Sequence, residues 1–237
     1  MMTATNRNGL LGAGLLAGTI IGAGVFSLPY IFRTAGLLTG TLFLLLGSAV
    51  YITLYIMYAE IITATQGEHR FVGYARVYLG RFASYAAVAI SIVQTVFVLT
   101  IYLILSRSFA NLITASGQGM HKLILFWVIG SVIIFLGVRR IAWLETLITA
   151  GMIAVLLLVF GLALISGAPL AGWDAAPGFG AFLLPLGPVL FSLAGRQAIP
   201  EVVKLRGNYK RDIAWGVIIS AAVYFIFVIS VLALSPV

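Results

Sequence analysis

The chain has 237 residues, of which 62% are hydrophobic and only 8% are charged. Because a soluble domain carries about 25% charged residues, this composition excludes an ordinary water-soluble fold. The formal net charge of +8 is spread over short segments, which argues against a nucleic-acid-binding face. The sequence contains no cysteine, so disulfides, thiolate chemistry and cysteine metal sites are excluded as well.

Long apolar stretches recur from one end of the chain to the other. Each is about 20 residues long, enough to cross ~30 Å of hydrocarbon. We count seven, at residues 10–32, 37–64, 82–106, 122–138, 142–166, 179–203 and 213–235. They predict an all-α membrane protein with a single membrane domain over residues 1–237.

The basic residues predict the orientation. With the N-terminus inside, ten of them fall in cytoplasmic segments: Arg7, Arg70, Arg76, Arg81, Arg139, Arg140, Lys204, Arg206, Lys210 and Arg211. Outer segments hold only Arg33, Arg107 and Lys122. This positive-inside bias predicts a multi-pass membrane protein with its N-terminus in the cytoplasm.

Three connections are longer than the rest: residues 65–81, 107–121 and 167–178. Residues 65–81 mix aromatic and basic side chains on the predicted cytoplasmic side. Two interpretations stay open for them, a helix lying against anionic lipid headgroups or a solvated loop.

The first and sixth spans carry residues that interrupt a membrane helix. The first has six glycines between Gly9 and Gly24, followed by Pro29. The sixth contains Pro185, Gly187, Pro188, Gly195, Arg196 and Pro200. If the sixth stretch did not cross the membrane, Arg196 and the four basic residues after it would all lie outside, against the positive-inside bias. The charge distribution therefore favours a span that crosses but is broken in its middle.

The two predicted breaks lie five spans apart. A repeat of five helices has an odd number of crossings, so its second copy would have inverted topology. We expect a first repeat over residues 10–166 and an incomplete second repeat over residues 179–235. The two breaks also share a short sequence pattern. In each, Ala-Gly is followed by four residues and then proline, beginning at Ala23 in the first break and at Ala194 in the second.

Broken backbone persists in a membrane only where protein covers it or where it lines a cavity, and paired broken helices are typical of transporter binding sites. Freed N–H groups attract a carboxylate and freed C=O groups an ammonium, which together match an α-amino acid. The candidate substrate-binding residues are Gly22, Ala23, Gly24, Val25, Phe26, Ser192, Leu193, Ala194 and Gly195. The alternative is helix packing through Gly14, Gly18 and Gly22, which are spaced by four.

Other polar residues are weaker candidates. Gln94 and Arg196 are possible site-lining residues. Glu60 and Glu145 allow interfacial placement or a proton relay, and Glu201 lies three residues before Lys204, a spacing that favours a surface ion pair. No enzyme motif or metal-ligand cluster occurs, so we predict neither an enzyme nor a cofactor.

The stretches GTIIGAGVFSLPYIFRTAGLLTG (residues 18–40) and LFSLAGRQAIPEV (residues 190–202) resemble the amino acid/polyamine/organocation transporters. They are most similar to the amino acid/auxin permease group with the bacterial tryptophan and tyrosine permeases. The resemblance implies the LeuT-type five-plus-five inverted-repeat fold and proton-coupled uptake of amino acids, with aromatic substrates suggested by the nearest group. It also implies that residues 22–26 and 192–195 hold the substrate.

Members of these families have ten or eleven spans, whereas this chain stops after the seventh. We therefore expect a partial sequence, with a true short protein as the alternative. Two other functions stay open: a seven-helix receptor-like protein, and a non-transporting fragment or helper subunit. The expected partners are an amino acid, protons and the lipid bilayer, and the sequence predicts no oligomeric state.

Overall fold

The computed structural model describes residues 4–67, 69–113, 120–135, 138–166, 181–205 and 208–234. All regular structure in these residues is helical, which confirms the predicted all-α class. The chain divides into two compact units, one formed by Met1–Gln66 with Met152–Val237 and the other by Gly67–Gly151. Helix α6 (Val138–Ser166) contributes residues to both units.

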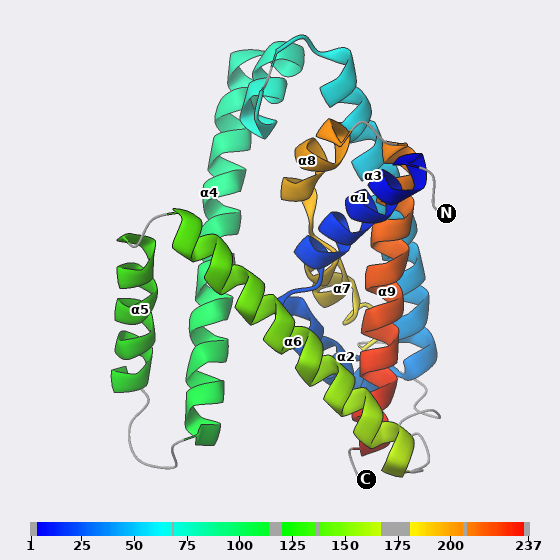
Figure 1. Ribbon diagram of the computed structural model, residues 1–237, viewed down its shortest axis with the longest axis vertical. Helices are drawn as coiled ribbons and strands as arrows, with labels where there is room; N and C mark the ends of the chain where they lie inside the picture. The colour runs from blue at the N-terminus through cyan, green and yellow to red at the C-terminus, as the bar shows by residue number, and fades with distance from the viewer. Residues whose placement is uncertain are drawn as a thin grey trace. The chain divides into compact units, whose positions relative to one another are not determined.

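The first unit contains the two predicted breaks. Its helices are α1 (Ala4–Ile20), α2 (Leu28–Ala35), α3 (Leu37–Ala64), α7 (Leu186–Ser192), α8 (Ile199–Lys204) and α9 (Tyr209–Leu234). Helix α9 packs against α1, α2, α3 and α8, and α3 also contacts α7 (Figure 1). The short helices α2 and α8 therefore lie between longer ones, and α7 packs against α3, α2 and the 3₁₀ segment Ala23–Ser27.

Helices α1 and α9 run in the same direction. A Cβ atom on Gly12 would lie 2.9 Å from Oδ2 of Asp212, and one on Gly216 would lie 2.9 Å from Cβ of Leu16. Further along both helices, the hydroxyl of Tyr224 donates a hydrogen bond to the carbonyl of Ile20. Because both sets of residue numbers rise together along the contact, the two helices are parallel, and glycine on either side brings their backbones close.

The core of the first unit lies around the breaks rather than apart from them. Its fully buried side chains come from both sides of each break: Leu16, Val25, Leu28, Phe32, Val189, Leu193, Ile199, Val202, Val217 and Tyr224. Burying such side chains contributes roughly 1.5–3 kcal/mol each in water, and in lipid it secures close packing. The broken segments are therefore packed parts of the fold.

The second unit is built on α4 (Phe71–Ile113) and α5 (Met120–Phe135), which pack together. Helix α4 turns sharply at Gly80, whose φ of 84° lies in the left-handed region that other residues avoid. Residues 71–79 thus form a separate helical segment, which agrees with the helical part of the first interpretation of residues 65–81, and contact with lipid headgroups stays a prediction. Beyond the kink the apolar side chains stay exposed, as Phe82 does at 88%, which suits contact with lipid.

Four helical stretches are long and apolar enough to cross a membrane: Leu37–Ala64, Phe71–Asn111, Thr149–Ser166 and Tyr209–Leu234. A bent pair, Leu11–Ile20 with Ala23–Ala35, makes a fifth, with 51° between its halves. Helix α3 has the same bounds as the predicted span 37–64, and α9 begins at Tyr209, four residues before the predicted start of the last span; that these helices cross the membrane stays a prediction. Crossing by residues 122–138 and 179–203 stays a prediction, because α5 has 16 residues and α7 and α8 are shorter still.

Some sequence predictions concern parts of the chain outside the described residues. The outer connection 167–178 lies wholly outside them, and residues 107–121 lie partly outside. The side chain of Glu145 is also outside the described part, so both interpretations of it stay predictions.

Candidate binding site at the two helix breaks

The first break separates α1 from α2. Helix α1 ends at Ile20, Gly22 adopts an extended conformation, and a short 3₁₀ helix over Ala23–Ser27 leads into α2. The N–H of Val25 bonds the carbonyl of Gly22 at 3.2 Å. Within the described part of the chain, no hydrogen-bond partner exists for the N–H groups of Gly22, Ala23 and Gly24. Three N–H groups at the start of the second half-helix therefore have no acceptor among the described residues.

The second break separates α7 from α8. Helix α7 ends at Ser192, residues 193–195 are non-helical, and a 3₁₀ turn over Arg196–Ala198 leads into α8. Both interruptions thus fall where the glycines and prolines predict them. The prediction of two broken helices is confirmed.

The two breaks touch each other. A Cβ atom on Gly24 would lie 2.7 Å from Cα of Ser192, and one on Gly195 would lie 2.5 Å from Cγ1 of Ile20. Both distances are shorter than real Cβ contacts, so only glycine allows the backbones to approach this closely. The sequence placed these segments in separate spans, and the fold brings them together.

Tyrosines of α3 hydrogen-bond the second break. The Tyr55 hydroxyl donates to the carbonyl of Leu193 at 2.8 Å and accepts from the N–H of Gly195 at 2.5 Å. One turn earlier, the Tyr51 hydroxyl donates to the carbonyl of Leu190 at 2.7 Å. These side chains replace helical hydrogen bonds that the break removes, because unpaired polar backbone is costly when buried.

A third tyrosine connects the two breaks. The hydroxyl of Tyr224 on α9 lies 2.6 Å from the carbonyl oxygen of Ile20 and 2.8 Å from that of Ser192. A hydroxyl has one proton to donate, so the two carbonyls share a single donor. Tyr224 is completely buried, and its position fixes the end of α1 relative to the end of α7.

The two breaks therefore differ in chemistry. The first offers free N–H groups at the positive end of a half-helix, which favours an anion such as a carboxylate. The second has its carbonyls bonded to hydroxyls from other helices. Together they present donors for an acidic group beside carbonyls with remaining acceptor capacity for an ammonium group.

The predicted site residues are distributed over buried and open positions. Gly24, Val25, Ser192, Leu193 and Gly195 are buried, whereas Gly22, Ala23 and Ala194 are partly exposed. Phe26 is exposed, and its ring meets the ring of Phe227 edge-on at 6.3 Å between centroids. Substrate contact by any of these residues stays a prediction, and Leu193 and Gly195 already use backbone groups on Tyr55.

The weaker candidates have different outcomes. Arg196 is partly buried in the second break itself. Gln94 lies on α4 in the other compact unit, and its place beside the site stays a prediction. A Cβ atom on Gly14 or Gly18 would meet nothing within 4 Å, so in the described residues these glycines do not serve close packing.

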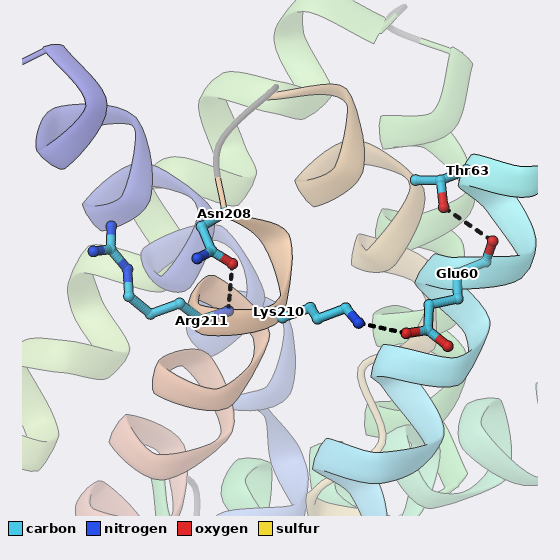
Figure 2. Close-up of polar contacts among 5 residues, drawn as sticks. All are labelled: Glu60, Thr63, Asn208, Lys210 and Arg211. Atoms are coloured by element: carbon cyan, nitrogen blue, oxygen red, sulfur yellow. Dashed lines mark hydrogen bonds and ion pairs between the residues drawn. The ribbon is translucent and has the colours of Figure 1, made fainter.

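The acidic residues near the helix ends are paired at the surface. Lys210 Nζ lies 2.6 Å from Glu60 Oε1, which joins the start of α9 to α3 (Figure 2). This pairing supports interfacial placement of Glu60. Lys204 Nζ lies 3.4 Å from Glu201 Oε1, so the predicted surface ion pair is confirmed. All four side chains are at least half exposed, where such pairs contribute about 0–1 kcal/mol.

Sequence analysis missed the tyrosines and one buried acid. Tyr51 and Tyr55 lie four residues apart on one face of a membrane helix, and a buried tyrosine hydroxyl usually has a hydrogen-bond partner. That spacing was the available signal for contact with broken backbone. Asp212 gave a second signal, because an acidic residue at the edge of an apolar span is rare enough to need a reason.

Comparison with known proteins gives one match. The model of the tryptophan/tyrosine permease family matches residues 5–234, nearly the full length. No curated protein and no solved structure is significantly similar to the chain.

Proposed function

The chain belongs to the tryptophan/tyrosine permease family, and we propose that it transports aromatic amino acids across the cytoplasmic membrane by proton symport. Membership in a permease family makes it a transport protein and not an enzyme. Its several long apolar helices fit a multi-pass membrane protein. The substrate site is the pair of touching helix breaks.

The observation that carries this site is the set of open N–H groups on Gly22, Ala23 and Gly24. In our proposal they bind the substrate carboxylate through charge-assisted hydrogen bonds, which are about twice as strong as neutral ones. The substrate ammonium binds the carbonyls of Ile20 and Ser192, which have only the Tyr224 proton between them. No ionised side chain is then required to recognise the amino acid.

The proposed aromatic preference rests on the family match, and the side chains around the first break fit it. Phe26 is exposed beside the open N–H groups and already makes an edge-to-face contact with Phe227. Aromatic pairs in this geometry gain about 0.5–1.5 kcal/mol beyond their buried area. In our proposal, the ring of a bound tryptophan or tyrosine packs against Phe26.

We propose the LeuT-type inverted-repeat fold for the full protein. The support is that the breaks occur in the first and sixth predicted spans and touch each other. The parallel packing of α1 and α9 adds to it, because spans one and seven both begin on the same side in the predicted topology.

We propose that the kink at Gly80 binds anionic lipid headgroups. A cavity of about 150 Å³ at this kink is lined by Arg76, Arg81, Ser84 and Tyr85. Two arginines beside hydroxyl groups suit a phosphate, and basic residues near a membrane surface attract anionic lipid by about 1 kcal/mol each.

Uptake by purified protein in lipid vesicles tests the proposed function. Labelled tryptophan or tyrosine should accumulate when the outside is more acidic, and a protonophore should abolish the accumulation. Alanine at the same concentration serves as the matched substrate control and should enter far more slowly. Uptake that a protonophore does not change would overturn proton coupling, and binding without uptake would favour the non-transporting alternative.

A further inference from the structure

Asp212 is a buried acid that the proposed substrate site does not use. It lies in the first turn of α9, and its side chain is only 1% exposed. Its Oδ2 atom points at Gly12 of α1, where an added Cβ would come within 2.9 Å. No hydrogen-bond donor reaches this oxygen in the part of the chain that the structure describes.

Some features around Asp212 favour its neutral form and others favour its ionised form. Burial without a donor on Oδ2 favours the neutral form, since an ionised carboxylate without hydrogen bonds is very costly to bury. The positive end of α9 and the exposed Arg211 favour the ionised form, but Arg211 Nε is 3.9 Å from Oδ1. The balance therefore depends on how closely α1 covers Oδ2.

The charged groups on the elements around α9 bear on this balance. Residues 11–20 of α1 have no titratable side chain. The ionisable side chains on the elements packed against α9, and on α9 itself, are Arg7, Tyr30, Arg33, Tyr51, Tyr55, Tyr58, Glu60, Glu201, Lys204, Tyr209, Lys210, Arg211 and Tyr224; the side chain of Arg7 lies outside the described part of the chain. Among them Glu60 binds Lys210 and Glu201 binds Lys204, so Asp212 is the buried carboxyl of this group.

We propose that Asp212 is a proton-binding site whose protonation holds α1 against α9 and whose ionisation releases it. A proton on Oδ2 removes the charge that close packing against Gly12 would otherwise bury. Loss of that proton leaves a carboxylate that needs water, and water reaches Oδ2 only when α1 moves away. Because α1 ends at the first break, this movement changes the substrate site.

The inference deepens the proposed proton symport and rests on it for its consequence in transport. Binding of the proton and packing of α1 are linked reciprocally. If the packed state binds the proton about ten times more tightly than the separated state, full ionisation raises the population of the separated state about tenfold.

The absence of cysteine allows a direct test of this movement. Ala17 is buried on α1, whereas the neighbouring Gly18 has open space around it. Single variants Ala17→Cys and Gly18→Cys are treated with a water-soluble thiol reagent between about pH 5 and about pH 8. Dividing the labelling rate of Ala17→Cys by that of Gly18→Cys removes the titration of the thiol itself. We expect this ratio to rise about tenfold with pH.

Asp212→Asn supplies the decisive comparison, because asparagine has the shape of the protonated acid and cannot ionise. In that background the ratio should stay low at every pH. Glu201→Gln is the matched control, since it removes an exposed carboxylate and should leave the rise unchanged. A flat ratio with Asp212 intact, or a rise that survives Asp212→Asn, would overturn the proposal.

A parallel uptake measurement separates this proposal from the proposed function. If the labelling ratio rises with pH and Asp212→Asn removes that rise, the proton site is supported. If uptake is then independent of the proton gradient, only the proposed symport is wrong. If uptake is driven by the proton gradient but the labelling ratio does not change with pH, the Asp212 proposal is wrong and the proposed symport is supported. If both hold, Asp212→Asn should remove the stimulation of uptake by an acidic exterior.

Discussion

The two helix breaks resemble each other in sequence but differ in what holds them. The first, around Gly22–Gly24, leaves three N–H groups without partners in the described structure. The second, around residues 193–195, is bonded by Tyr51, Tyr55 and Tyr224 from two other helices. The first break thus has backbone donors without acceptors among the described residues, whereas the backbone of the second is hydrogen-bonded by side chains from other helices; in our proposal the first takes the ligand.

The largest expected effect on substrate binding comes from adding a side chain at the first break. In Gly24→Leu the new Cβ meets main-chain atoms of Ser192, so α2 must move away from α7. Overpacking of this kind costs about 1–3 kcal/mol, and we expect amino acid binding to weaken by roughly 10- to 100-fold. Equilibrium binding of labelled tryptophan measures it.

Gly18→Leu is the control for this change, because a side chain there meets open space and should leave binding intact. Wild-type affinity in Gly24→Leu would remove the first break from the site.

The largest expected effect on stability comes from Tyr55→Phe. It leaves the buried carbonyl of Leu193 and N–H of Gly195 without their shared partner. Each unsatisfied group costs about 1–3 kcal/mol, so we expect the free energy of unfolding to fall by about 2–6 kcal/mol. Denaturation of the protein in detergent measures this change, with Tyr51→Phe, which loses a single bond, falling less. A greater effect of Tyr55→Phe on affinity than on stability would reverse our assignment of the two breaks.

Tyr224→Phe should have an intermediate effect that appears in both measurements. It removes the one donor shared by the carbonyls of Ile20 and Ser192. We expect the free energy of unfolding to fall by about 1–3 kcal/mol. Substrate should bind this variant with altered affinity, because its ammonium no longer competes with the hydroxyl proton. If unfolding and binding both match the wild type, Tyr224 does not connect the breaks.

The smallest effect is expected at the surface, far from either break. Lys210→Ala removes the exposed ion pair with Glu60. Such pairs contribute about 0–1 kcal/mol and weaken in salt, so the loss should vanish at high ionic strength. Thermal unfolding at two salt concentrations measures it. A salt-independent loss would mean that Lys210 does more than join α3 to α9.

Much of this arrangement was predictable from local sequence. Glycine and proline gave the places where α1 and α7 stop, since both disfavour continuous helix whatever surrounds them. Span 37–64 was predictable at both ends because its apolar run is uninterrupted. The spacing of Glu201 and Lys204 predicted their pairing for the same local reason.

The partners of the breaks were not predictable in this way. The contacts of Tyr55 with Gly195 and of Tyr224 with Ile20 depend on the packing of distant helices, which residue spacing does not encode. The burial of Asp212 depends likewise on Gly12, whose role shows only when α1 and α9 are seen side by side. Gly14 and Gly18 show the converse. Their spacing is typical of close helix packing, but a Cβ atom on either would meet no described atom within 4 Å.

The link between Tyr224 and Ile20 also bears on how the protein is made. Ile20 and Tyr224 are 204 positions apart in the sequence, so the carbonyl of Ile20 is synthesised long before the Tyr224 hydroxyl that bonds it. Since chains emerge N-terminus first and distant contacts form late, the first break must wait in the membrane with that carbonyl unsatisfied until α9 arrives. Assembly of the site is therefore among the last steps of folding, and a nascent chain released before α9 would have its helices but no completed site.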